Sequence, residues 1–200
     1  MATRSSTISN RALTRALAQI QKDDEVTRVE AARTLSTDPA SFVPLRSLLK
    51  AATRPETRLS IVFALSWQRD MRSWAIFTRI LGDETESPAV RAQAAEGLAY
   101  NFYRKRRGKS SFQSAIELLE TALTDPSPEV RYYAAFALGA SGERGAIPAL
   151  RRIAKDRSTS TNFVGTVGDE AMDAINQIKS CPRTARTPPK TGSPISRPRE

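Results

Sequence analysis

The chain has 200 residues, with 31 Lys and Arg against 21 Asp and Glu, no histidine and one cysteine, Cys181. Without histidine there is no Ser-His-Asp or Cys-His nucleophile pair and no imidazole metal ligand, and a single cysteine forms neither an intramolecular disulfide nor a cysteine-based zinc site. The apolar share of 40% is enough for a core in one domain or in two small ones.

The net charge of +10 is concentrated in three segments. Residues 1–22 and 182–200 each carry +4, and the run 104–109 carries +5, so the rest of the chain is close to −3. The basic character therefore belongs to the two ends and to one loop of the chain, not to its folded body.

No segment is long and apolar enough to cross a membrane. The longest apolar run is 61–65, whereas a spanning helix needs roughly 18–20 residues. The polar start, residues 1–9, leads into an amphipathic segment and not into an apolar signal sequence. We expect a cytoplasmic protein without a membrane partner.

The first predicted element is a capping helix behind Asn10, because Leu13, Leu17 and Ile20 lie on one helical face. Four segments then repeat one pattern, in which an arginine is followed three, four and seven positions later by residues that form one apolar face. A fifth copy begins at Val167, with glycine at the arginine position. The arginines are Arg28, Arg58, Arg91 and Arg131.

The repeated segments begin with residues that favour helix starts. An Asp or Ser accepts hydrogen bonds from free backbone amides, and a proline occupies the first helical position. The predicted caps are Asp24, Ser87 and Ser127, and the prolines are Pro55, Pro88 and Pro128. We expect Gly139 to end the helix of the fourth copy.

A second apolar-periodic stretch follows each of the four arginine-containing helices, within 42–49, 74–81, 115–123 and 147–154. Helix pairs that recur every 30–40 residues are typical of helical repeat proteins. We predict an all-α chain, an α-solenoid superhelix of about five helix pairs with an N-terminal capping helix and no sheet.

The predicted organisation has three parts. Residues 1–8 form a flexible N-terminus, 9–180 the repeat domain with a basic insert at 103–111, and 181–200 a disordered tail rich in Pro and Arg. The tail contains too few apolar residues to form a core.

Residues 125–150 carry the most specific pattern, Asp-Pro-Ser-Pro-Glu-Val-Arg-Tyr-Tyr-Ala-Ala-Phe-Ala-Leu-Gly-Ala-Ser-Gly followed by Glu-Arg-Gly-Ala-Ile-Pro-Ala-Leu. This segment closely resembles the HEAT-like repeat of the phycobilisome-lyase type; the resemblance is strong over 125–156 and good over 87–102. It implies a curved, right-handed stack of helix pairs in which the second helices line the concave face. The chain departs from that pattern at the insert 103–111 and at Gly168.

The row of repeated arginines allows two interpretations. One arginine per repeat either bonds carbonyl or acidic groups of the adjoining turn, as an internal ladder, or presents a row of charges to a ligand. The structural interpretation is favoured because the spacing follows the repeat unit.

Trp67, Asp70 and Trp74 resemble the aromatic and acidic residues with which helical-repeat DNA glycosylases hold a damaged nucleotide. Aligning the repeats places Trp74 with Val43 and Ile147 inside the second helix, and Asp70 with Glu143 in a turn. Core packing of Trp74 is therefore the favoured interpretation.

The basic run is the most unusual local feature, and five cations are enough to attract phosphate. The alternative is a solvated insert that only lengthens a loop. This candidate polyanion patch consists of Arg104, Lys105, Arg106, Arg107 and Lys109.

No feature of the sequence requires an enzyme or a cofactor, since the paired acids all lie at helix starts, where they complement the helix dipole. Cys181 is expected to be an ordinary free thiol. The favoured function is a non-catalytic scaffold that binds a protein or peptide, with acidic groups, on the second helices. The candidate binding residues are Arg46, Lys50, Arg79, Arg151, Arg152 and Lys155.

Two alternatives belong to other classes. The resemblance to the lyase-type repeat allows a bilin lyase or a lyase accessory subunit. The resemblance to glycosylase solenoids, together with the basic insert and tail, allows a nucleic-acid-binding protein. The scaffold hypothesis depends on an excess of basic residues on the second helices. Glu117 and Glu120, in the second helix of the third repeat, interrupt that excess.

Overall fold

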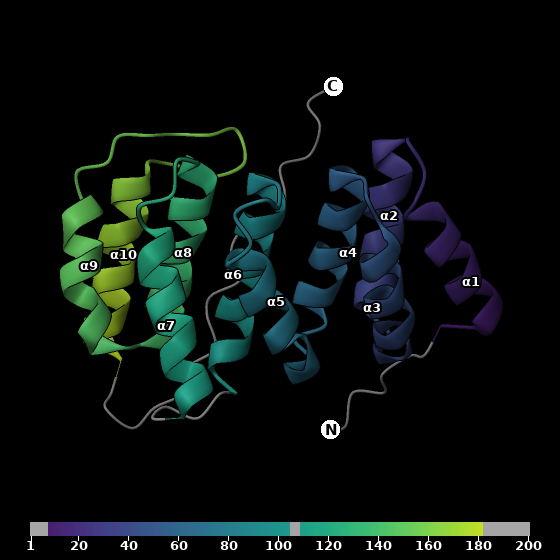
Figure 1. The fold of residues 1–200 in the computed structure, drawn as a ribbon, viewed down its shortest axis with the longest axis horizontal. Helices are drawn as coiled ribbons and strands as arrows, with labels where there is room; N and C mark the ends of the chain where they lie inside the picture. Colours follow the sequence, from purple (N-terminus) through teal and green to yellow (C-terminus); the bar gives the residue numbers. More distant parts are fainter. Residues whose placement is uncertain (1–7, 105–108, 182–200) are drawn as a thin grey trace. The chain divides into compact units, whose positions relative to one another are not determined.

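The structure is a computed structural model that describes residues 8–104 and 109–181. Over these residues the chain contains ten α-helices, three short 3-10 helices and no strand (Figure 1). The prediction of an all-α chain is confirmed over these residues. The flexible ends, the tail and part of the basic insert, which were predicted from the sequence, fall on residues outside those described.

The helices follow the repeat pattern, with four pairs between two single helices. The fifth copy is represented by its first helix, α10. In chain order the elements are α1 (Asn10–Gln19), α2 (Glu25–Ser36) with α3 (Phe42–Ala51), α4 (Pro55–Trp67) with α5 (Trp74–Leu81), α6 (Pro88–Phe102) with α7 (Ser110–Ala122), α8 (Pro128–Ser141) with α9 (Ile147–Ile153), and α10 (Val167–Ser180).

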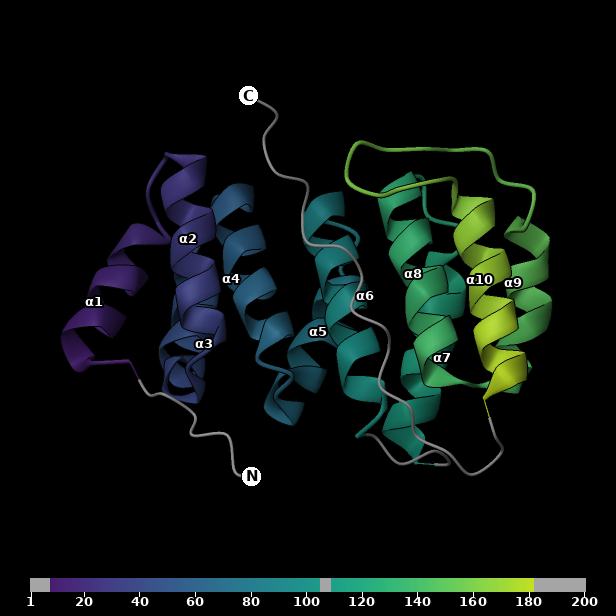
Figure 2. The ribbon, with the colours of Figure 1, turned by 180° about the vertical axis from the view of Figure 1, so that it is seen from behind.

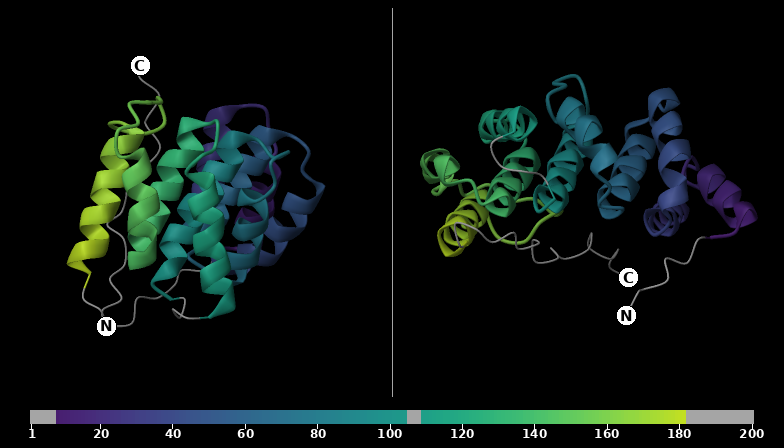
Figure 3. Two further views of the ribbon diagram at one scale, coloured as in Figure 1. Left: turned by 60° about the vertical axis from the view of Figure 1, so that its left-hand side comes forward. Right: turned by 90° about the horizontal axis from the view of Figure 1, so that it is seen from below.

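The chain divides into two compact units, residues 1–97 and 98–200, and α6 contributes to both. In the first unit α2 packs against α1 and α4, and α3 packs against α4. In the second unit α8 and α10 lie side by side (Figure 2), and α7 and α9 form a second layer against them (Figure 3).

The apolar positions of the repeat form the core of each unit. In three of the four copies a pair of alanines lets helices approach closely, and in every copy the leucine three positions after the pair is buried. The buried positions are Ala31, Ala32 and Leu35, then Ile61, Val62 and Leu65, then Ala94, Ala95 and Leu98, then Ala134, Ala135 and Leu138.

The predicted helix starts are largely confirmed. Asp24 accepts a hydrogen bond from the Thr27 amide at 2.7 Å, and each of the three predicted prolines is the first residue of its helix. Two details differ. The N-cap of α1 is Ser9, so Asn10 is already helical. Ser127 is the N-cap of α8 as predicted, but its side chain makes no capping bond; its amide donates to the Asp125 carboxylate at 2.8 Å.

Gly139 was wrongly expected to end a helix. It lies inside α8, and the left-handed residue at the end of that helix is Gly142, with φ of 62°. Gly139 instead faces α10, where an added Cβ would fall 2.9 Å from the Cα of Ala174. The glycine is therefore needed for close packing of two helices, not for a turn.

Replacing Gly139 with Ala should lower the free energy of unfolding by about 1–3 kcal/mol, because α8 and α10 must separate to admit the methyl group. Gly145→Ala is the matched control, since a Cβ there meets only a Glu143 side-chain oxygen at 3.6 Å. Urea unfolding measures both. Equal stabilities of the two variants would contradict close packing at position 139.

Candidate functional site

The repeated arginines are bound to their own chain. Arg58 donates from Nη1 to the carbonyl oxygens of Leu49 and Ala52, at 2.9 Å each, and from Nε to the Glu86 carboxylate at 2.8 Å. These carbonyls lie at the end of the preceding helix, where no intrahelical donor remains. Arg58 therefore joins the end of one repeat to the start of its own repeat and, through Glu86, to the following connection.

Arg131 makes the same kind of connection in the second unit. Its Nη1 donates to the carbonyl oxygens of Asp125 and Pro126, at 2.7 and 3.0 Å, and its Nε to the carboxylate of Asp156 at 2.8 Å. Burial alone would raise the pKa of Asp156, but hydrogen bonds from Ser158 and Arg131 outweigh it and hold that pKa below its usual value. Asp156 is thus a carboxylate that pairs with the arginine of the preceding repeat.

The remaining copies agree with this structural role. Arg28 donates from Nη1 to the carbonyl oxygens of Lys22 and Asp23. Arg91 is buried, with 8% of its surface exposed. The ladder interpretation is confirmed for Arg28, Arg58 and Arg131, and the alternative of a ligand-binding row is wrong for these three.

Gly168 explains the missing fifth arginine. An added Cβ would lie 2.7 Å from the carbonyl oxygen of Ala154 and 2.9 Å from that of Asp156, and the Gly168 amide donates to the Asp156 carbonyl at 2.8 Å. In this copy the backbone itself approaches the carbonyls of the preceding connection. A side chain at this position would clash with them.

The six candidate binding cations contrast with these arginines. Arg46 and Lys50 on α3 and Arg79 on α5 are exposed in the first unit. In the second unit Arg151 and Arg152 on α9, and Lys155 just beyond it, are also exposed.

Among the described residues none of the six forms an ion pair. Arg79 acts only at longer range on Asp83, whose pKa is lowered first by hydrogen bonds from Thr85 and then by Arg58 and Arg79. The structure brings Arg46 and Lys50 together on one helix, and Arg151, Arg152 and Lys155 at the end of another.

Two members of the candidate polyanion patch are described. Arg104 and Lys109 are exposed, and the guanidinium of Arg104 lies 5.4 Å from the ring centroid of Tyr103. Lys105, Arg106 and Arg107 lie outside the described residues. The ends of the insert are held by Phe102 and Phe112, whose rings meet edge to face at 5.3 Å, as expected for aromatic residues that anchor a loop.

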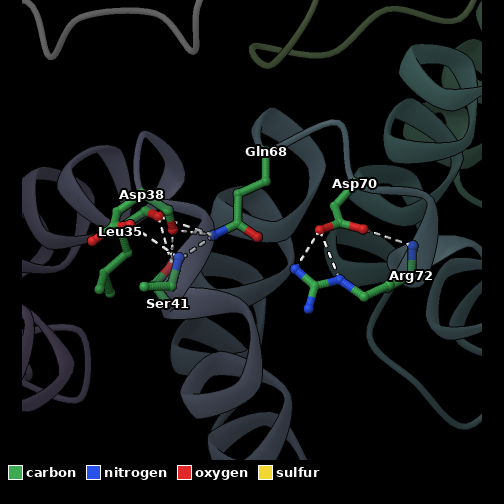
Figure 4. Close-up of polar contacts among 7 residues, drawn as sticks. Leu35, Asp38, Ser41, Gln68, Asp70 and Arg72 are labelled. Atoms are coloured by element: carbon green, nitrogen blue, oxygen red, sulfur yellow. Dashed lines mark hydrogen bonds and ion pairs between the residues drawn. The ribbon is translucent and has the colours of Figure 1, made fainter. Parts of the chain in front are cut away.

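Asp70 and Trp74 have structural roles. Asp70 accepts from the amide of Arg72 at 2.8 Å and from its Nε at 2.9 Å, and so begins the 3-10 helix Met71–Ser73 (Figure 4). Trp74 is 5% exposed, which confirms core packing. Its assumed counterpart Val43 is 53% exposed, so this part of the alignment was wrong by one residue. The buried counterpart is Phe42, the first residue of α3.

Gln68 makes a connection between repeats that was not predicted. Its Nε2 donates to the carbonyl oxygens of Leu35 and Asp38, at 3.0 and 3.1 Å, and to Oγ of Ser41 at 2.6 Å (Figure 4). Glutamine at the end of α4 therefore completes the turn of the preceding pair. The only sequence signal was the polar residue after Trp67.

Residues 8–104 and 109–181 contain no cluster of three or more Cys, Asp or Glu side chains that is placed to hold a metal ion. Cys181 is half-buried and forms no disulfide. Over the same residues, no helix has the length and apolarity that would let it span a bilayer.

The comparisons with known proteins agree with this geometry. The family model for HEAT repeats matches residues 83–162, which include α6 to α9. No curated protein matches the sequence.

Among solved structures, one similar to this chain is that of the complex of CpcE and CpcF of phycocyanin lyase from Nostoc sp. PCC7120. The match has 16% sequence identity and a TM-score of 0.68, and covers 83% of this chain and 99% of that one. A crystal structure of an engineered protein has 19% identity and covers 86% of this chain and 98% of its own. Its TM-score is only 0.35, so the two folds are not alike overall. Residues 83–162 therefore match HEAT repeats, and the chain has the helical-repeat fold of this lyase complex, as its sequence predicted.

The two classes of arginine should respond differently to substitution. Arg58→Met should cost about 2–3 kcal/mol of stability, because Glu86 and two carbonyl groups lose a charged donor. Arg46→Met, on the exposed surface of the same unit, should change stability by less than about 0.5 kcal/mol. Thermal and urea unfolding measure both, and an equal loss for the two variants would contradict the ladder.

Proposed function

We propose that the protein is a non-catalytic HEAT-repeat scaffold that binds a protein or peptide partner through exposed cations on its second helices. The observation that carries this proposal is the division of the cations into two classes. Arginines of the first helices bond to carbonyls and carboxylates of their own chain, whereas Arg151, Arg152 and Lys155 are exposed at the end of a second helix.

The chemistry of this surface favours an acidic partner. Arg151 and Arg152 occupy the last turn of α9, where positive charge complements the helix dipole, and neither forms an ion pair among the described residues. Exposed arginines form bidentate bonds with carboxylates and are enriched at protein interfaces. An acidic segment of a partner would supply the carboxylates.

The solved complex of CpcE and CpcF supports a protein partner, because a chain of similar fold is there assembled with a second protein. The same likeness keeps a lyase subunit as a second candidate function. Co-purification of a coloured tetrapyrrole with the protein would favour that function over the scaffold. A salt-dependent shift of duplex DNA would instead favour nucleic-acid binding through the insert.

The test uses charge reversal on opposite layers of the second unit. Wild-type protein captures its partner from the native cell, and the affinity of the purified pair is then measured for Arg151→Glu, Arg152→Glu and Lys179→Glu. Lys179 is exposed on α10, so it is a control with the same charge change on the other layer. We expect at least one α9 variant to weaken binding tenfold or more, and the Lys179 variant to bind normally.

Neutralising the five cations of the insert provides the second arm of this test. Under the scaffold proposal the insert variant keeps its affinity for the partner. If the insert variant alone loses binding, the loop is the site and the second-helix assignment is wrong.

We also propose that residues 182–200 form a tail that does not contribute to the fold, since they offer few apolar side chains for burial. Removing them should leave the melting temperature within about 2 °C of the full chain, because few contacts stabilising the folded state would be lost. Calorimetry of the two chains measures this. A clear fall would show that the tail packs on the repeats.

A further inference from the structure

The connection between α9 and α10 departs most from the repeat. It spans residues 154–166, whereas the other connections between pairs occupy 52–54, 82–87 and 123–127. The chain passes from α9 across the end of α8 and returns to α10 (Figures 1 and 2). We call residues 157–166 the strap.

Two side chains of the strap donate to one carboxylate oxygen on α8. Oε1 of Glu129, in the first turn of α8, accepts from Oγ of Ser160 at 2.7 Å and from Nδ2 of Asn162 at 2.6 Å. Oγ of Ser160 also accepts from the Asn162 amide at 3.2 Å. That bond lies within the strap, so it holds the two donors together without any help from Glu129. The strap therefore presents a preformed pair of donors to a carboxylate.

The strap has further contacts that do not involve Glu129. The hydroxyl of Tyr133 donates to the Asn162 carbonyl at 3.3 Å. The ring of Phe163 stacks on that of Tyr132, with centroids 4.1 Å apart and 16° between the planes. At the end of the strap, Thr166 forms the capping box that begins α10. These contacts keep the strap beside α8 when the carboxylate at position 129 is removed or displaced.

The carboxylate of Glu129 is held only by neutral donors. Both bonds reach the same oxygen, Oε1. Among the described residues no cation pairs with this carboxylate. Neutral hydrogen bonds near the surface compete with water and contribute little, whereas bonds between a carboxylate and a guanidinium are shorter and stronger. A carboxylate that also reaches a cation would therefore compete well with Glu129 for the two donors.

Exposed cations precede the donor pair along the chain. They lie in the last turn of α9, just beyond it, and at the start of the strap, and none forms an ion pair among the described residues. The acid between them, Asp156, is bound by Arg131. Arg157 acts at longer range on Asp169, whose pKa is lowered first by hydrogen bonds from Thr166. The cations are Arg151, Arg152, Lys155 and Arg157.

We propose that Ser160 and Asn162 form a carboxylate-binding site, which Glu129 occupies in the free chain and an acidic residue of the partner occupies in the complex. This inference rests on the acidic partner proposed above, whose other carboxylates bind the cations at the end of α9. Glu129 is then an internal competitor that lowers the affinity for the partner. It favours segments with enough acidic residues to bind the cations and to displace Glu129 from the strap.

The size of the effect follows from the fraction of chains in which the donors are free. The apparent affinity of a ligand falls in proportion to the fraction of protein that is competent to bind it. Two surface hydrogen bonds to a carboxylate favour the occupied form by a factor on the order of ten. Removing the Glu129 carboxylate should therefore strengthen binding of an acidic segment about three- to tenfold.

Binding of a fluorescently labelled oligoglutamate peptide tests the proposal. The full chain with the five cations of the insert neutralised is used, so that the peptide does not bind there, and fluorescence anisotropy gives Kd at physiological ionic strength. We expect Glu129→Ala to lower Kd about three- to tenfold. Asp173→Asn is the control for net charge, because Asp173 is exposed on α10 outside the strap, and it should change Kd by less than about twofold.

A double-mutant cycle separates the carboxylate site from a general effect of charge. In a chain that carries Ser160→Ala and Asn162→Ala, Glu129→Ala should no longer strengthen binding, because the donors are absent, whereas a charge effect would persist. A Kd that Glu129→Ala does not lower, or lowers equally with and without the donors, overturns the proposal.

The α9 surface is tested separately with the same peptide. If Arg151→Glu and Arg152→Glu weaken binding but Glu129→Ala has no effect, the carboxylate site is wrong and the proposed function stands. If both arginine variants bind the peptide normally, or the parent chain does not bind it, the acidic partner is wrong, and the inference that rests on it is overturned with it.

Discussion

Carbonyl groups in the connections that precede the first helices, and at the end of α3, lie outside the helical hydrogen-bond pattern and need donors. One residue position per repeat supplies them. Arg58 and Arg131 each reach back to two carbonyls of the preceding segment and forward to a carboxylate, so three successive segments share one guanidinium. Where Gly168 replaces arginine, the backbone moves close enough to donate its own amide. Whether an arginine side chain or the Gly168 amide donates to these carbonyls therefore decides how closely the first helix approaches the preceding connection.

This constraint separates the cations that hold the fold from those available to a partner. The guanidinium of Arg58 or Arg131 already donates to carbonyls and to a carboxylate of its own chain. Binding a ligand would break these bonds and leave the carbonyls without donors. Arg151 and Arg152 of α9 do not have this structural role. The carboxylate in the turn after α9, Asp156, is already bound by Arg131. In the scaffold proposed above, the binding charges therefore lie on the second helices and not on the first.

The sequence predicted the helices, whose buried positions repeat periodically. It did not predict contacts in which a residue binds one particular partner far along the chain. Offsets of three, four and seven residues identified the helices, because every copy repeats the same buried face. Glu86 and Asp156 lie 28 and 25 residues beyond the arginines that they bind, and no short pattern indicates such pairs. The expectation for Gly139 was wrong for the same reason: Gly139 and Gly142 both suit a helix end, and only the proximity of Ala174 shows that Gly139 packs against α10. At the equivalent position of α4 the left-handed residue is Arg69, with φ of 52°, so composition alone does not reveal this turn.

Two connections are longer than the others. One follows α6 within a pair, and the other, residues 154–166, follows α9 between pairs. The buried faces persist beside both, since Phe102 packs edge to face on Phe112 and Asp156 binds Arg131. A repeat stack tolerates such extensions because each copy contacts only its neighbours.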